Sequence, residues 1–194
     1  MILPIVAYGD PVLRKKTKEI NSDYPKLVEL IADMKQTMYN AEGVGLAAPQ
    51  IGKAIRLFVI DASLFANDNE ISDSERAVLR NFNKVFINPK ILKQQGELWA
   101  FNEGCLSIPE VREDIFRQQT VTIEYKDENF NYHTETLNGL AARIFQHEYD
   151  HLEGVLFTDK LSSLKKRLIK KKLDNISKGK VKPGYRMQFP IDKK

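Results

Sequence analysis

The sequence is poor in sulfur and imidazole: its 194 residues contain one cysteine and three histidines. A single cysteine excludes an internal disulfide, so the fold does not depend on an oxidising compartment. Apolar runs are short, and none approaches the roughly 20 residues that span a bilayer. The first ten residues lack the charge and length of a secretory signal and the Arg- and Ser-rich character of a transit peptide. We therefore expect a cytoplasmic protein with no membrane partner.

Charge of one sign is concentrated in a single segment. The net charge is +4, and apart from the C-terminal region the chain is close to neutral. The basic residues of that region are Lys165, Lys166, Arg167, Lys170, Lys171 and Lys172. A solvated helix face is the simpler interpretation of such a run. The alternative is attraction to a polyanion such as RNA; we expect no contact with DNA.

Two of the three histidines fall in one HExxH pattern, at residues 147–151. On a helix, residues four apart share a face, so His147 and His151 could reach one metal ion with Glu148 beside them as a general base. The pattern also arises by chance, and paired helical histidines can be ordinary core residues. Cys105 offers a third ligand, which would leave one tetrahedral position open. His133 lies in a polar strand-like run and needs no function.

The remaining pattern predicts an α+β fold of mixed strands around the HExxH helix, with an N-terminal helix and a C-terminal helix. We expect one domain over residues 1–178 and a tail over 179–194 that is either poorly ordered or a strap across the surface. Asp23 should cap the first helix, with Pro25 in its first turn, and Asn138 should cap the HExxH helix. Other elements are predicted as strands at 55–61, 85–88, 91–101, 120–126 and 132–137, a surface loop at 66–74, and helices at 74–83 and 162–177.

The segment GVGLAAPQ at residues 43–50 is the most glycine-rich part of the first half. It matches the G-x-G-x-x-A dinucleotide pattern only weakly, because it follows a helix and Pro49 obstructs a helix starting inside it. No Gly-Lys-Ser/Thr follows, which excludes a P-loop. Glycines allow the backbone to approach a ligand closely, and Gln50 adds an amide donor.

Three blocks in one chain, GVGLAAPQ at 43–50, EGCLS at 103–107 and QHEYDH at 146–151, resemble the peptide deformylase family. The resemblance runs nearly end to end and includes the start DPVLR at 10–14. Members of this family remove the formyl group from new bacterial polypeptides. The resemblance implies an α+β fold with the HExxH helix packed among antiparallel strands, and an N-formylmethionyl peptide as substrate.

The resemblance also implies roles for individual residues. It makes Cys105, His147 and His151 the metal ligands and Glu148 the general acid/base. The Gln50 side chain and the Leu106 backbone N–H become donors to the developing oxyanion. Gly45 and its loop would hold the peptide in extended form, and Arg143 would lie near the pocket for the methionine side chain. The substrate-contacting residues expected are Val44, Gly45, Glu103, Gly104, Leu140 and Ile144, and also Arg112, which follows the Cys105 block in the sequence.

The chemistry agrees with this ligand set. Three protein ligands leave one position for a water molecule whose pKa falls toward neutrality and which then attacks the formyl carbon, releasing formate. Glu148 would take the water's proton and deliver it to the departing amine. A site with one thiolate tolerates Fe²⁺, Co²⁺, Ni²⁺ or Zn²⁺. The family resemblance favours Fe²⁺ in the cell.

Two other functions stay open at this point. A zinc endopeptidase would need a further His or Glu ligand, yet no histidine follows His151. A structural zinc site in an RNA-binding module would fill the fourth position, yet no second cysteine exists. The 162–177 helix could also dock a monomeric enzyme on the ribosome. Arg112 and Arg117 either order the substrate or form a surface salt bridge with Asp150.

Overall fold

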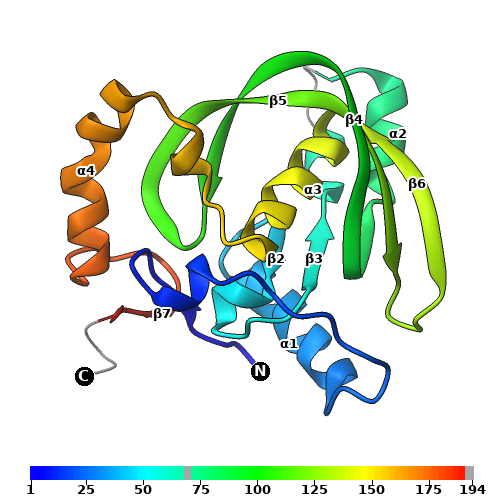
Figure 1. Ribbon diagram of the computed structural model, residues 1–194, viewed down its shortest axis with the longest axis horizontal. Coiled ribbons are helices and arrows are strands. Elements are labelled where there is room, and N and C mark those ends of the chain that lie inside the picture. Colours follow the sequence, from blue (N-terminus) through cyan, green and yellow to red (C-terminus); the bar gives the residue numbers. More distant parts are fainter. Residues whose placement is uncertain (68–70, 191–194) are drawn as a thin grey trace.

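The long hairpin of β4 (Asn83–Cys105) and β5 (Ile108–Lys126) dominates the fold (Figure 1). The computed structural model describes residues 1–67 and 71–190. An antiparallel sheet joins β2 (Gly45–Ala47), β3 (Leu57–Asp61), β4, β5 and β6 (Tyr132–Asn138) in that order, and a small parallel sheet pairs β1 (Ile5–Val6) with β7 (Met187–Gln188). The helices are α1 (Leu27–Asn40), α2 (Asp73–Arg80), α3 (Gly139–Leu152) and α4 (Ser163–Ser177), with 3-10 turns at Pro11–Arg14, Ala48–Ile51, Ser63–Asn67 and Phe157–Lys160.

Helix α3, which carries the HExxH pattern, is the central helix. Figure 1 shows it framed by the β4–β5 ribbon, with α1 and α4 at the periphery. Most α3 residues are buried, including polar ones such as Gln146 and Glu148. A helix buried nearly all round belongs to the core rather than to one surface layer. The α+β prediction with this helix at the centre is therefore confirmed.

The main sheet is covered on both faces, as the alternation of β3 shows. Phe58 and Ile60 pack in one core cluster with α3, whereas Leu57 and Val59 pack in another with α1. Successive strand residues point to opposite faces, so one short strand joins both clusters. A third cluster links the β4–β5 turn, β1 and α4.

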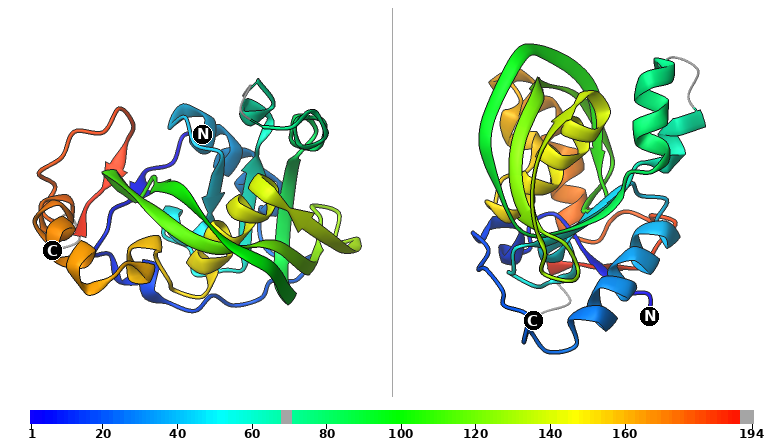
Figure 2. Two further views of the ribbon diagram at one scale, coloured as in Figure 1. Left: turned by 90° about the horizontal axis from the view of Figure 1, so that it is seen from above. Right: turned by 90° about the vertical axis from the view of Figure 1, so that its right-hand side faces the viewer.

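The β4–β5 ribbon is strongly curved (Figure 2). Its register shifts at four places, including between Ile87 and Lys90 and between Gly104 and Cys105. The sequence predicts that a strand ends at Pro89, but β4 continues through it. The register shift spans this proline, whose missing N–H would otherwise interrupt the ladder. The sequence also missed residues 108–119, which extend β5 well before Thr120.

Helix starts were predicted less well than helix positions. The predicted Asp23 cap is wrong: α1 begins at Leu27, after Lys26 takes a left-handed conformation. Asn138 precedes α3 but gives it no side-chain cap; its Oδ1 instead accepts a hydrogen bond from Thr120 Oγ1 at 2.7 Å. The 162–177 helix is confirmed, with the Ser162 hydroxyl accepting from Lys165 N–H.

The chain beyond α4 folds back along the N-terminal strand. Ile5 N–H donates to Arg186 O at 3.0 Å and Ala7 N–H to Gln188 O at 2.9 Å. This agrees with the strap alternative for residues 179–190; residues 191–194 of the predicted tail, and 68–70 of the predicted 66–74 loop, lie outside the described residues. In the described ranges, no helix combines the length and apolar character needed to cross a bilayer.

Candidate metal centre

The three predicted ligands come together between α3 and the tip of the β4–β5 hairpin. His147 and His151 lie one turn apart on α3, and Cys105 is the last residue of β4. The ligand atoms of all three lie within 4.8 Å of one another. Cys105 Sγ is 3.3 Å from His151 Nε2. One thiolate and two imidazoles at this spacing match the donors of a tetrahedral site for a divalent transition metal.

The electrostatics of the group favour a cation. Burial lowers the pKa of His147, but hydrogen bonds to Cys105 and Glu103 outweigh burial and raise that pKa well above its ordinary value. Burial, followed by the charge of His147, holds the pKa of His151 well below its ordinary value. The lowered pKa of His151 keeps its imidazole neutral, the form that binds a metal, and the hydrogen-bond partners of His147 favour positive charge beside that ring. Among the described residues the group has no fourth protein ligand.

Glu148 is buried beside these ligands and is only partly satisfied. Its Oε2 has no hydrogen-bond partner within residues 1–67 and 71–190. Burial raises the pKa of Glu148 to about 7, with the charge of His147 opposing the shift. A buried carboxylate without a partner for one oxygen costs several kcal/mol unless a ligand or water satisfies it (on the order of 1–3 kcal/mol for a neutral group, more when charged). Such a group is suited to exchange a proton near neutral pH.

Gly45 makes room for that carboxylate. A Cβ built on Gly45 would overlap Glu148 Oε1, with the Glu148 Cδ atom at 2.8 Å. The backbone of β2 therefore passes close to the acid, as the glycine pattern of the segment predicts. Gln50 lies on the same side: its Oε1 accepts from Ala47 N–H at 2.8 Å, which turns its Nε2 toward Cys105 Sγ at 3.5 Å.

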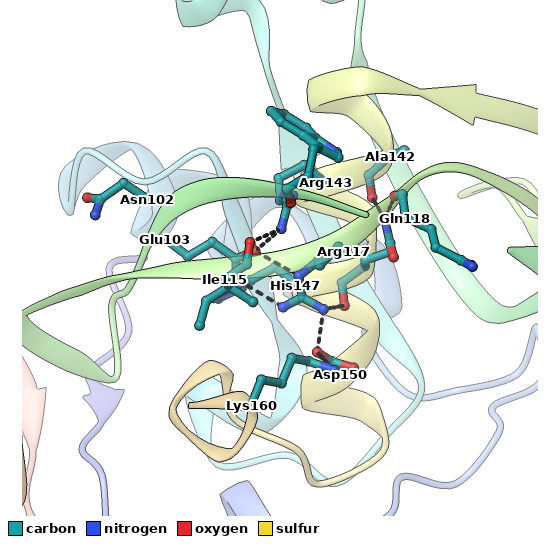
Figure 3. Close-up of polar contacts among 12 residues, drawn as sticks. Asn102, Glu103, Ile115, Arg117, Gln118, Ala142, Arg143, His147, Asp150 and Lys160 are labelled. Atoms are coloured by element: carbon teal, nitrogen blue, oxygen red, sulfur yellow. Dashed lines mark hydrogen bonds and ion pairs between the residues drawn. The ribbon is translucent and has the colours of Figure 1, made fainter. Parts of the chain in front are cut away.

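Behind His147 lies a buried ion network around Glu103 (Figure 3). The Glu103 carboxylate accepts from His147 Nδ1 at 2.9 Å, from Arg143 at 2.9 Å and from Arg117 at 2.7 and 2.9 Å. Arg117 also pairs with Asp150 at 2.6 Å. Burial alone would raise the pKa of Glu103, but the hydrogen bonds from His147 and Arg117 hold it well below its usual range. Glu103 thus orients His147 as a charged acceptor.

This network changes two of the sequence interpretations. The Arg117–Asp150 pair exists, but Arg117 is buried rather than at the surface. Arg143 is 1% exposed, donates to backbone carbonyls of Trp99 and Ile115, and lies 4.5 Å from the Trp99 ring centroid. Arg112 bonds Asn102 rather than Asp150; because it lines the cavity described below, its contact with substrate stays a prediction. The sequence offers one signal for this network. Arg117 and Arg143 are charged residues within segments that form a strand and a helix.

A cavity of about 760 Å³ opens onto Cys105 and His147 of the candidate ligand group. Its size falls in the usual range for small-ligand sites, about 300–1,000 Å³. The predicted site residues that line it are Val44, Gly45, Gln50, Glu103, Gly104, Cys105, Leu106, Arg112, Ile144, His147 and Glu148. Leu140 and His151 are not among the residues that line it, and Leu140 packs in a core cluster. The sequence did not predict the contributions of Phe65 or of residues 182–185.

The chain is similar to known proteins along nearly its whole length. The profile described as polypeptide deformylase matches residues 2–167. A peptide deformylase of Christiangramia forsetii is 67% identical over 194 residues, covering 100% of this chain and 99% of the relative. One of Flavobacterium psychrophilum is 62% identical, covering 97% of each. The solved peptide deformylase of Legionella pneumophila has a TM-score of 0.77 at 38% identity, covering 93% of this chain and 98% of its own.

These matches agree with the three ligands, the buried acid and the cavity. The family match covers the three ligands, the buried acid and the cavity wall up to His147 and Glu148. The chain therefore belongs to the polypeptide deformylase family, and it is a metal-dependent hydrolase that removes the N-formyl group from newly made polypeptides.

Proposed function

We propose that Cys105, His147 and His151 hold one divalent cation and that Glu148 is the acid and base of deformylation. The observation that carries this proposal is the buried Glu148 carboxylate, one oxygen of which lacks a partner among the described residues, beside a three-donor group. A bound cation at such a site activates water as a nucleophile and stabilises charge on a carbonyl oxygen. The ligand group itself serves to fix that cation next to the acid.

Glu148 carries the proton that moves from the attacking water to the departing amine. As a carboxylate it takes a proton from the water that attacks the formyl carbon. The new C–O bond forms first and moves the carbonyl π pair onto the formyl oxygen. When that pair re-forms the carbonyl, the C–N bond breaks, and Glu148 returns the proton to the departing amine, so that formate and a free N-terminus leave. The raised pKa of Glu148, about 7, suits a group that must both accept and donate near neutrality.

Gln50 and Leu106 would stabilise the charge that develops on the formyl oxygen. Gln50 Nε2 lies 3.5 Å from Cys105 Sγ and 3.4 Å from Ser107 Oγ, so its N–H groups face the ligand group. Leu106 follows the Cys105 ligand directly and lines the cavity. Donors fixed before reaction are worth most in a dry site; losing one typically costs about 3–4 kcal/mol of barrier.

The cavity wall fits an extended peptide with an apolar first side chain. We assign Val44, Gly45, Gly104 and Arg112 to the peptide and Ile144 to the methionine side chain, all of which line the cavity. β2 is an edge strand of the main sheet, so a substrate strand could pair with its backbone. Glu103 is kept as part of the wall, with its carboxylate committed to His147, Arg117 and Arg143.

A formate-release assay tests this assignment. Metal-loaded protein should release formate from a formyl-Met peptide and should not cleave an internal peptide bond, which separates it from a zinc endopeptidase. Glu148→Gln should abolish turnover while leaving metal content unchanged. Unimpaired formate release by Glu148→Gln would overturn the role of Glu148, and loss of the metal from that variant would assign the carboxylate to the metal instead.

Fe²⁺ is the metal we propose for the protein in the cell, with Zn²⁺, Ni²⁺ or Co²⁺ as possible substitutes. The thiolate in the ligand set tolerates all four. Oxygen should then inactivate the iron-loaded protein through the iron and Cys105, whereas the nickel-loaded protein should survive in air. Metal analysis of protein purified without oxygen checks the choice, and equal loss of activity with both metals refutes it.

We also propose that the enzyme is a cytoplasmic monomer, that its one catalytic domain over residues 1–178 is completed by the part of the tail that lines the cavity, and that α4 contacts the ribosome. Its cations Lys166, Arg167, Lys170, Lys171 and Lys172 are exposed, while Lys165 is held by Glu113 at 2.8 Å. Reversing the charge of Lys166, Lys170 and Lys171 should weaken ribosome binding and its salt dependence. Reversing Lys53 and Lys93, exposed elsewhere, is the control; equal ribosome affinity for all variants would discard the contact.

A further inference from the structure

The two-residue turn between β4 and β5 carries part of the active site. Cys105 ends β4, Ile108 begins β5, and the two are paired, so Leu106 and Ser107 form the turn itself. A ligand sulfur and a proposed oxyanion donor therefore sit at the tip of a hairpin, where strand pairing restrains the backbone least. Turn tips are the most mobile part of a hairpin unless other groups bind them.

Three groups from other parts of the chain bind this turn. Tyr8 N–H donates to Ser107 O at 2.8 Å. Gln50 Nε2 lies 3.4 Å from Ser107 Oγ. The Tyr185 hydroxyl donates to Leu106 O at 2.7 Å. The first two fix Ser107, so Tyr185 supplies the side-chain restraint on the carbonyl of Leu106.

Tyr185 comes from a segment that the family profile does not reach. The profile ends at residue 167, whereas Lys182, Pro183, Gly184 and Tyr185 line the cavity. We name residues 181–188 the C-terminal strap. The strap is anchored by the pairing of β7 with β1, whose Ile5 and Val6 are each 1% exposed. Tyr8 follows β1 and Tyr185 precedes β7, so one small sheet presents both groups to the turn.

We propose that Tyr185 is a positioning residue for deformylation, acting through Leu106, and that the C-terminal strap is a wall of the peptide-binding cavity. Tyr185 fixes the peptide plane that follows Leu106, and this limits rotation of Leu106 about its own backbone bonds. The Leu106 N–H, one plane earlier, then keeps the direction in which it meets the formyl oxygen. This inference rests on the proposed role of the Leu106 N–H.

The consequence is a loss of turnover without a loss of substrate binding. Tyr185→Phe removes the hydroxyl and leaves the ring that lines the cavity. Because an oxyanion donor acts on charge that exists only in the transition state, kcat should fall while KM stays the same. A misdirected donor costs less than an absent one, so we expect a decrease of about tenfold rather than a hundredfold or more.

The experiment compares Tyr185→Phe with Tyr132→Phe in the full metal-loaded chain. Tyr132 is an exposed tyrosine on β6, away from the cavity-lining residues. The measurements are kcat and KM for a formyl-Met peptide, bound metal, and the carbonyl-carbon NMR shift of Leu106, which reports the hydrogen bond directly. We expect Tyr185→Phe alone to lower kcat and move the Leu106 shift, with metal content unchanged.

Three other results overturn the proposal. Unchanged kcat in an active Tyr185→Phe protein, with the Leu106 shift moved, would leave a hydrogen bond with no role in catalysis. Equal effects of both variants would indicate a general loss of tyrosine hydroxyls rather than positioning. An unmoved Leu106 shift would deny the hydrogen bond itself, whatever the activity. Failure of the parent protein to release formate would instead count against the proposed function, because the NMR comparison does not depend on turnover.

Discussion

His147 and Glu103 are joined by a 2.9 Å hydrogen bond between the imidazole Nδ1 and the carboxylate Oε2. The bond leaves the other ring nitrogen of His147 to face Cys105 in the ligand group. The same carboxylate pairs with Arg117 and Arg143, so the ring orientation and two buried guanidiniums depend on one residue. A single change at Glu103 should therefore affect both metal binding and folding.

We predict that Glu103→Gln weakens metal binding about 10- to 100-fold, because the neutral amide orients and polarises His147 less well. It should also lower the free energy of unfolding by about 3 kcal/mol, since two buried cations lose their shared carboxylate. Metal titration and denaturant unfolding of the metal-free protein measure the two effects separately. Glu97→Gln, at an exposed position of β4, is the matched control. Wild-type metal affinity in Glu103→Gln would show that Glu103 does not orient the ligand.

Gly45→Ala should inactivate the enzyme without unfolding it. The added methyl group would overlap Glu148 Oε1, and the carboxylate must turn away from the reacting atoms to relieve the overlap. A displaced general base costs about 10²–10⁴-fold in rate. Gly96→Ala, on the β4–β5 ribbon, is the control. Gly96 has a positive φ of 88°, so an alanine there should lower the stability of the protein without changing its activity. Comparable kcat values for the two variants would contradict the packing of Gly45 against Glu148.

The candidate metal ligands, which the structure brings together, could be predicted from the sequence, but the network behind them could not. His147, Glu148 and His151 follow from helical periodicity, which the sequence shows directly. Cys105 was predicted as a ligand because it is the only cysteine in the sequence and because the family resemblance implies it. Glu103 and its arginines meet across separations of 14 and 40 residues, through strand pairing and helix packing. Side chains from such distant positions carry no local pattern, so sequence reasoning placed Arg117 at the surface.

The fold shows the same division. The helices and most strands were predicted because their apolar spacing is local. The predicted strand end at Pro89 was wrong because a register shift lets β4 continue past the proline. Asn138 occupies the predicted N-cap position of α3, but its side chain does not cap the helix because Thr120, on the neighbouring strand, binds it. In both cases a tertiary contact outweighed a correct local preference.

The β5–β6 turn should carry an acid-sensitive part of the stability. Asp127 accepts from Asn129 N–H and Asn131 N–H, both at 2.9 Å, and from His133 at 2.8 Å. Its hydrogen bond with His133, more than any other contact, lowers the pKa of Asp127 from 3.8 to about 2. A lowered carboxyl pKa contributes stability that is present above about pH 4 and is lost as pH falls toward 2.

Asp127→Asn should therefore have a lower Tm than the parent protein at pH 5 to 7. The difference in Tm should become smaller between pH 4 and pH 2. Thermal unfolding of both proteins over this range is the measurement, with Glu128→Gln in the same turn as control. A Tm difference that does not change with pH would assign the effect to lost hydrogen-bond geometry rather than to the carboxylate charge.

A residue of α2 binds the first turn of α3, and the sequence did not indicate this structural role. Glu75 Oε1 accepts from Leu140 N–H at 2.8 Å, so a carboxylate from α2 caps the helix that carries His147. Glu75→Ala should lower the free energy of unfolding by about 1 kcal/mol, the typical value of a helix cap, and thus Tm by about 2–4 °C. Glu75→Gln keeps an acceptor but loses the charge that favours the helix N-terminus, so its effect should be smaller.

Neither variant should change kcat, because Glu75 does not line the cavity. The control is Glu128→Ala, a change at an exposed glutamate. If both Glu75 variants had the same Tm as this control, α2 would not stabilise the helix that carries His147.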